Sequence, residues 1–235
     1  MASLALIFGL VAGAVALIGL IGAYSGLLAP LTGFQLFAGG GLLGGLLALL
    51  VSAVGIATTR GGRDLEGRKK ALLGGAIAIV LLSLVLVPGV SGLDYPPIND
   101  ISTDLEDPPS FAPASTVPDY AGRDMSYPPE FVAVVRDHYP DLQPIDLPDP
   151  PTAAFEKARA AAESLGWEIV ASAPDRGVFD ARDVTAIFRF VDDVTVRVVP
   201  RGTGSRVDIR SKSRDGRGDL GANAIRIRAF AKALR

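Results

Sequence analysis

The chain of 235 residues contains no cysteine and a single histidine, His138. The absence of cysteine excludes disulfide bonds, thiolate catalysis and zinc sites built on thiolates. The lone histidine has no second ligand or nucleophile beside it in the sequence, and the aspartates lack the fixed loop spacing of an EF-hand. The sequence therefore predicts no metal site and no cofactor.

Charge is also missing from the first 59 residues, and the first charged side chain is Arg60. A bilayer core about 30 Å thick requires roughly 20 apolar residues in a helix. Three uncharged runs meet this length, at residues 3–23, 37–57 and 71–90, and Pro88 is expected to mark the end of the third. The sequence therefore predicts three transmembrane helices, and without an ionisable residue inside them it predicts no ion or proton pathway.

The distribution of basic residues predicts how these helices cross the membrane. The loop between the second and third runs holds five of them: Arg60, Arg63, Arg68, Lys69 and Lys70. The loop between the first and second runs holds none. The positive-inside rule then places the basic loop and the N-terminus in the cytoplasm. Everything after Val90 is expected on the periplasmic side of a bacterial inner membrane.

Glycines recur four residues apart in the predicted helices, and this spacing lets helix backbones approach closely. The three pairs are Gly9 with Gly13, Gly40 with Gly44, and Gly41 with Gly45. One interpretation is packing within the three-helix bundle in the lipid bilayer. The other is packing against a partner membrane protein, in which case the chain is a subunit of a larger complex.

Residues 92–151 differ in composition from the rest of the chain, with 13 of the 17 prolines and a net charge of −10. Frequent prolines disfavour helix and favour extended backbone. The remaining residues, 152–235, carry a net charge of +5. We therefore expect three regions: transmembrane helices at 1–91, an acidic strap at 92–151 that lies on the following domain, and an α+β domain at 152–235. A short helix is expected within the strap at 130–138.

The last region predicts the element order α-β-β-β-β-α, with an antiparallel sheet whose helices cover one face. The first helix is expected at 152–166, with Thr152 as N-cap, and the last begins at Asp219. Alternation predicts that the apolar face of the strands contains Trp167, Ile169, Ala171, Phe179, Ala181, Ala186, Phe188, Phe190, Val194, Val196, Val198, Val207 and Ile209. The opposite face is expected to contain Asp180, Arg182, Arg189, Arg197, Asp208, Arg210 and Lys212, as cross-strand charge pairs on a face that the fold can leave in water.

The segment "VDIRSKSRDGRGDLGANAIRIRAF" joins the last strand to the last helix and is the candidate functional site. Its glycines permit tight turning, and a helix N-terminus attracts anions. The candidate anion or partner site comprises Arg197, Arg210, Ser211, Ser213, Arg214, Arg217, Asp219, Asn223 and Arg226. Asp192 and Asp193 are near enough to pair with these arginines. A structural Arg–Asp network is the first interpretation, and an anion site is the second. No catalytic residue is assigned, because neither serine has a base beside it in the motif.

Several separated motifs resemble those of the bacterial and plastid domain-of-unknown-function family 1499. They are "YPPINDISTD", "GWEIV", "FVDDVTVRV" and the segment quoted above. The family pattern RSxSRxGxxDLGxN falls on Arg210, Ser211, Ser213, Arg214, Gly216, Asp219, Leu220, Gly221 and Asn223, while Asp215 stands where an apolar residue is more usual. The resemblance implies a membrane-associated module and supplies no activity or catalytic residues.

The sequence favours a non-enzymatic envelope protein whose periplasmic domain binds a partner protein or an anionic amphiphile. The alternative is an enzyme for an anionic envelope substrate, with Asp192 or Asp193 as acid and base, and with Arg210, Arg214 and Arg217 as an anion clamp. Nucleic-acid binding is not expected, because the basic domain lies across the membrane from the cytoplasm.

Overall fold

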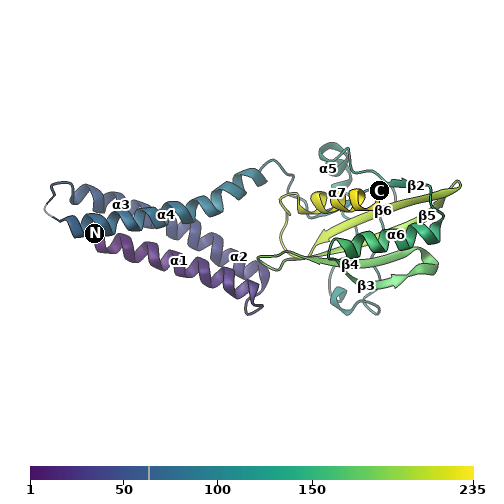
Figure 1. Ribbon diagram of the computed structural model, residues 1–235, viewed down its shortest axis with the longest axis horizontal. Helices are drawn as coiled ribbons and strands as arrows, with labels where there is room; N and C mark the ends of the chain where they lie inside the picture. The colour runs from purple at the N-terminus through teal and green to yellow at the C-terminus, as the bar shows by residue number, and fades with distance from the viewer. Residues whose placement is uncertain (63) are drawn as a thin grey trace. The chain divides into compact units, whose positions relative to one another are not determined.

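Figure 1 shows the computed structural model of the chain, in which long apolar helices are followed by an antiparallel sheet with helices. The predicted α+β class is therefore confirmed. The structure describes residues 1–62 and 64–235, so Arg63 of the basic loop lies outside the described residues.

The chain divides into two compact units. The first, called the helical unit, comprises Met1–Asp94 together with Ala186–Arg189. The second, called the sheet domain, comprises Tyr95–Thr185 and Phe190–Arg235. The acidic strap thus folds with the sheet that follows it.

The helical unit contains three helices that are long and apolar enough to cross a membrane. The first is α1 (Ala2–Tyr24). The second is formed by α2 (Pro30–Gly39), the π-helical turn η1 (Gly40–Gly44) and α3 (Gly45–Thr58) in succession. The third is α4 (Leu65–Gly92). The three predicted apolar helices are confirmed, with a length and composition that fit a membrane.

Two proline positions differ from the expectation. The second span begins at Pro30 rather than at residue 37, because proline fits the first turn of a helix, where no intrahelical N–H is needed. The third span passes through Pro88 and ends at Gly92. The prediction that Pro88 ends it was wrong, because one proline removes a single backbone donor and apolar membrane helices tolerate that loss.

Most of the six glycines that are spaced four residues apart in the sequence pack inside the helical unit. A Cβ atom on any of these five would contact a neighbouring helix: Gly9, Gly40, Gly41, Gly44 and Gly45. Gly74 makes a still closer approach, since a Cβ there would lie 2.5 Å from the Ala5 carbonyl oxygen. A Cβ atom on Gly13 would meet no atom of another helix within 4 Å among the described residues. The glycines therefore serve packing between these helices, as the first interpretation expects.

The sheet domain is built on six antiparallel strands. The predicted meander is β3 (Glu168–Ala173), β4 (Val178–Val184), β5 (Val191–Arg201) and β6 (Gly204–Ser213). The strap adds β1 (Asp100–Ser102) and β2 (Ile145–Leu147), which both pair with β6 and give the order β1-β6-β5-β4-β3. These two short strands were not predicted, because the many prolines of the strap disfavour regular strands.

One face of the sheet, called the helix face, packs against α6 (Pro151–Ser164) and α7 (Ala222–Leu234), which lie across it in Figure 1. Trp167 stacks on Phe230 of α7 with ring centroids 5.4 Å apart. The buried apolar strand residues on this face are Phe179, Ala181, Val194, Val196, Val198, Val207 and Ile209, as alternation predicted.

Three predicted boundaries are wrong. Residues 186–190 form the turn between β4 and β5 instead of a strand. The N-cap of α6 is Pro150 rather than Thr152, since the helix starts at Pro151. The last helix starts at Ala222 instead of Asp219, because Leu220 and Gly221 adopt left-handed backbone conformations with φ of 52° and 82°.

A bulge in β3 also breaks the predicted alternation. The register shifts between Ile169, which faces Ala181, and Ala171, which faces Asp180. The extra residue moves Ala171 to the face opposite Ile169. The prediction that Trp167, Ile169 and Ala171 share one face was therefore wrong for Ala171.

The second face of the sheet, called the strap face, is covered by the strap instead of water. Ala112 donates its backbone N–H to Asp180, and the Ser110 carbonyl lies 3.5 Å from the Thr195 hydroxyl. The strap also contains the 3₁₀ turn η2 (Pro118–Tyr120) and α5 (Phe131–His138), the latter close to the predicted short helix. Asp180, Asp208 and Arg210 on this face are consequently buried, while Arg182, Arg197 and Lys212 are partly buried.

Candidate functional site

The arginine-rich segment is divided between the two faces of the sheet. Arg210, Lys212 and Arg214 project onto the strap face, while Ser211 and Ser213 project onto the helix face, because side chains alternate along β6. The candidate site residues therefore do not converge on one surface.

Arg210 joins the strap to the sheet. Its Nε and Nη2 atoms donate to the two oxygens of Asp100 on β1 at 2.9 and 2.8 Å, and the two side chains are 2% and 0% exposed. Nη2 also donates to the carbonyl oxygens of Met125 and Ser126, and the guanidinium lies 4.9 Å from the centroid of the Phe111 ring. Such an arginine is enclosed by its own fold and cannot reach an external anion.

Arg214 also forms ion pairs that join the strap to the sheet. It donates to both oxygens of Asp193 at 2.8–2.9 Å and to Asp119 of the strap at 3.2 Å. Burial raises the pKa of Asp193, and hydrogen bonding to that carboxylate raises the pKa of Arg214. Lys212 lies 3.0 Å from Asp100. The cations of the motif on this face are thus held by carboxylates.

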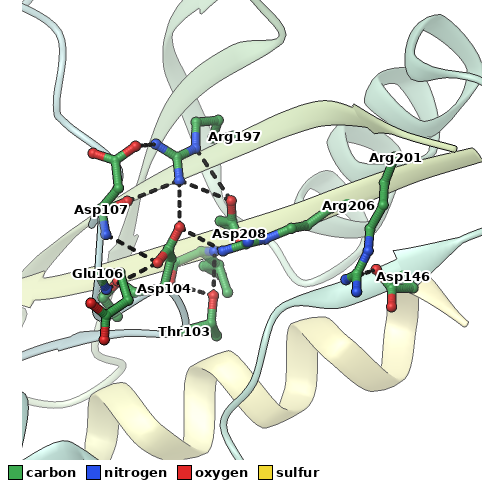
Figure 2. A network of polar contacts seen from close by, with 11 residues as sticks. Thr103, Asp104, Glu106, Asp107, Asp146, Arg197, Arg201, Arg206 and Asp208 are labelled. Carbon is green, nitrogen blue, oxygen red and sulfur yellow. Dashed lines mark hydrogen bonds and ion pairs between the residues drawn. The ribbon is translucent and has the colours of Figure 1, made fainter.

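Figure 2 shows Arg197 among three carboxylates. Its guanidinium lies 2.8 Å from Asp104, 2.7 Å from Asp107 and 3.0 Å from Asp208. Arg206 approaches Asp208 from the other side at 2.7 Å. Because Asp104 and Asp107 belong to the strap, this network fastens the strap to β5 and β6.

Arg226 belongs to a separate network on the helix face. From α7 it donates to Asp192 at 2.5 Å and to Asp183 at 2.8 Å, and its side chain is 6% exposed. It also donates to the Ser211 hydroxyl at 3.2 Å. Arg226 therefore neutralises the two aspartates that β4 and β5 place opposite each other.

Asn223 links the serines of β6 to the strap. The Ser211 hydroxyl donates to its Oδ1 atom at 2.6 Å, and its Nδ2 atom donates to Ser213 and to the Asn99 carbonyl oxygen at 3.0 and 3.1 Å. Asn223 is fully buried, so these hydrogen bonds fix the position of α7. Neither serine is available as a nucleophile.

The last two candidates lie in the turn before α7. Asp219 accepts backbone N–H groups from Gly221 at 2.9 Å and Asn223 at 2.7 Å, and burial raises its pKa. Its carboxylate thus occupies the amides that an external anion would use. Arg217 is exposed and forms no ion pair within residues 1–62 and 64–235.

A pocket of about 290 Å³ lies between the strap and the strands β3 and β4. The strap contributes Ser110, Phe111, Ala112, Pro113 and Thr116. The sheet contributes Ala171, Val178 and Asp180, and the short turn η3 (Pro174–Arg176) contributes Arg176. The sequence predicted Asp180 as a paired surface charge, and it predicted no pocket here. The β3 bulge that brings Ala171 to the same side as Asp180 has no signal in the sequence.

Asp180 differs from the other aspartates of the strap face because it forms no ion pair with any arginine that the structure describes. It is 1% exposed, and its Oδ2 atom accepts the Ala112 N–H at 2.7 Å. Its Oδ1 atom is buried and accepts no hydrogen bond from the described residues. The Thr195 and Tyr120 hydroxyls both lie near this carboxyl group, but neither completes a hydrogen bond to Oδ1. Burial raises the pKa of Asp180.

The comparison with known proteins bears on the sheet domain. No curated protein matches the chain. A family model described as "Protein of unknown function (DUF1499)" matches residues 100–234, which extend from β1 to the end of α7. The matched residues contain every arginine–aspartate ion pair described above. This match covers more than half of the chain and agrees with the resemblance in the sequence motifs. The chain belongs to the DUF1499 family.

Proposed function

We propose that this chain is a membrane-anchored, non-enzymatic envelope protein whose sheet domain binds a partner protein or an anionic amphiphile on the periplasmic side. The three long apolar helices support the anchor. The non-enzymatic assignment rests on one observation: both candidate acid–base residues, Asp192 and Asp193, are held by arginines within the fold. A carboxylate engaged in this way is poorly placed to exchange protons with a substrate.

The predicted orientation can be tested directly because the native chain has no cysteine. Single cysteines at Leu27, Gly61 and Thr203, all exposed, would each report one segment. In intact spheroplasts, a membrane-impermeant maleimide should label the Leu27→Cys and Thr203→Cys variants and spare Gly61→Cys. Lysed spheroplasts should be labelled at all three positions. The reverse pattern in intact spheroplasts would place the sheet domain in the cytoplasm and overturn the orientation.

Binding can be tested by purifying the full chain in mild detergent and identifying bound lipids and proteins by mass spectrometry. The wild type should retain an anionic amphiphile or a specific protein. Arg210 and Arg214 are unsuitable for alanine substitution here, because both hold the strap to the sheet. Arg217→Ala is the suitable variant and should weaken retention if the turn before α7 contributes. A folded wild type that is recovered without any ligand or partner contradicts the proposal.

One observation favours the enzymatic alternative. Asp180 lines a pocket, has no ion pair with an arginine in the described part of the chain, and has a raised pKa, which are properties of many general acids. Incubating any co-purified ligand with the wild type and with Asp180→Asn would separate the two functions. Conversion of the ligand by the wild type alone would establish an enzyme. Retention without conversion by the wild type supports a binding protein.

A further inference from the structure

The pocket beside Asp180 has the dimensions of a small ligand site. Its volume of about 290 Å³ lies at the lower end of the range for small-molecule pockets, roughly 300–1,000 Å³. Its walls are mainly apolar, with Phe111 and Pro113 from the strap and Val178 from β4. A ligand for this site needs a compact apolar body.

The polar end of the pocket requires a specific kind of group. Asp180 lines the pocket, and its buried Oδ1 atom has no hydrogen-bond partner among the described residues. The Thr195 and Tyr120 hydroxyls lie near the same carboxyl group, but Tyr120 does not line the pocket. A buried polar atom without a partner is unfavourable, so a ligand that supplies the partner gains affinity. A hydroxyl group suits either protonation state, because it donates to a carboxylate and accepts from a carboxylic acid. An ammonium group can only donate.

The rim of the pocket supplies an open positive charge. Arg176 is exposed and has no ion pair within the described part of the chain. Arg197 also lines the pocket, but three carboxylates already surround it. An anionic group on the ligand would therefore be attracted to Arg176 instead of Arg197.

The local sequence builds this arrangement from three features. The β3 bulge turns the small side chain of Ala171 toward the side of the sheet that carries Asp180, which leaves space above the carboxyl group. Ala112 hydrogen-bonds to Asp180 and holds the strap over that space. Gly177, with φ of 64°, forms the turn that places Arg176 at the rim, and a Cβ there would collide with the Val198 carbonyl oxygen.

We propose that this pocket binds a small hydroxylated organic anion, whose hydroxyl contacts Asp180, whose apolar body lies between the strap and β4, and whose acidic group faces Arg176. This inference rests on the proposed binding function and specifies the chemistry of its ligand. The matched probes are 3-hydroxyoctanoate, octanoate, which lacks the hydroxyl, and 1,3-octanediol, which lacks the charge.

The experiment is equilibrium dialysis of each probe against the full chain in nanodiscs, with empty nanodiscs as the control for partition into lipid. The wild type should bind 3-hydroxyoctanoate about tenfold more tightly than either other probe, which is the usual effect of one well-placed polar contact. Asp180→Ala should abolish the preference over octanoate, and Arg176→Gln should abolish the preference over 1,3-octanediol. Arg201→Gln, a change at an exposed arginine outside the pocket, should preserve both.

Ala171→Phe provides a second test that leaves Asp180 and Arg176 in place. The larger side chain should fill the pocket and remove specific binding of all three probes. The inference is overturned if the wild type does not discriminate among the probes, or if a folded Ala171→Phe protein binds them unchanged. If the wild type binds none of them but retains another ligand during purification, the ligand class is wrong and the binding function stands.

Discussion

The helical unit and the sheet domain use opposite kinds of interior. The buried residues of α1 are alanines and glycines only: Ala2, Ala5, Gly9, Ala12, Ala16, Gly19, Gly22 and Ala23. The interior of the sheet domain adds buried charge to its apolar core, including Asp100, Asp193, Asp208 and Arg210. The same chain therefore excludes charge from one interior and concentrates it in the other.

The difference follows from what surrounds each unit. In the lipid surroundings proposed for these helices, the hydrophobic effect provides no driving force between them, so small residues that allow close van der Waals contact stabilise the packing. The strap carries a net negative charge, and residues 152–235 carry a net positive charge. Where the strap lies on the sheet, its aspartates form ion pairs with arginines of the strands. Once buried, each pair must remain intact, because removing one partner leaves an uncompensated charge.

The largest expected effect comes from breaking the most buried pair. Asp100→Asn would leave Arg210 and Lys212 facing a neutral side chain in a buried site. We expect a loss of about 3–5 kcal/mol in the free energy of unfolding of the sheet domain. Urea unfolding followed by fluorescence measures it, because Trp167 is the only tryptophan and lies in this core. Unchanged stability would mean that the pair is not needed to hold the strap.

The helical unit offers a comparison based on volume. Gly74→Ala would place a Cβ 2.5 Å from the Ala5 carbonyl oxygen, and overpacking of this kind costs about 1–3 kcal/mol. Gly13→Ala is the matched control and should be neutral or stabilising, because that position is open and alanine favours helix. Modification of a cysteine introduced at the buried Ser52 reports opening of this unit. Equal modification rates in the two variants would contradict the packing argument.

Asp180 is expected to behave unlike the paired aspartates. Asp180→Asn should change stability by no more than about 1 kcal/mol at neutral pH, since the amide oxygen can still accept the Ala112 N–H. The raised pKa of Asp180 means that the native state binds more protons than the unfolded state as the pH falls toward about 4. The wild type should therefore gain stability relative to Asp180→Asn as the pH falls. Urea titrations between pH 8 and pH 4 measure this, and a parallel pH dependence would refute it.

The smallest effect is expected at the surface. Arg201 and Asp146 lie 2.6 Å apart, but their side chains are 59% and 61% exposed. Asp146→Asn should therefore reduce stability by less than about 1 kcal/mol, and added salt should remove even this difference. The loss caused by Asp100→Asn should persist in salt. A similar salt dependence of the two variants would show that burial does not determine the difference between the Asp100 and Asp146 ion pairs.

The sequence predicted the elements that follow a simple period. The three apolar runs and the alternating core residues Val194, Val196 and Val198 depend only on length and periodicity, so no tertiary information was needed. The local departures were not predictable in this way. The bulge after Ile169 and the left-handed turn at Leu220 depend on how neighbouring strands and helices meet.

The candidate site illustrates the same limit. The sequence identified Arg210, Arg214 and Arg226 and offered nearby aspartates as partners for the cluster. The pairing of Arg214 with Asp193 and of Arg226 with Asp192 agrees with that structural interpretation. The partner of Arg210 lies 110 residues away on a strand that the sequence analysis did not predict, so only the pairing of β1 with β6 reveals it.

By itself the sequence determined the three apolar helices, the acidic strap, the order of the sheet elements and the family motif, because each depends on composition or on a local repeat. The tertiary structure decided which charges are neutralised and which are left open. The strap covers one face of the sheet and pairs its aspartates with most of the arginines there, while Asp180 lines a pocket and forms no ion pair among the described residues. That outcome depends on which side chains meet across long separations in the chain, and a local pattern contains no such information.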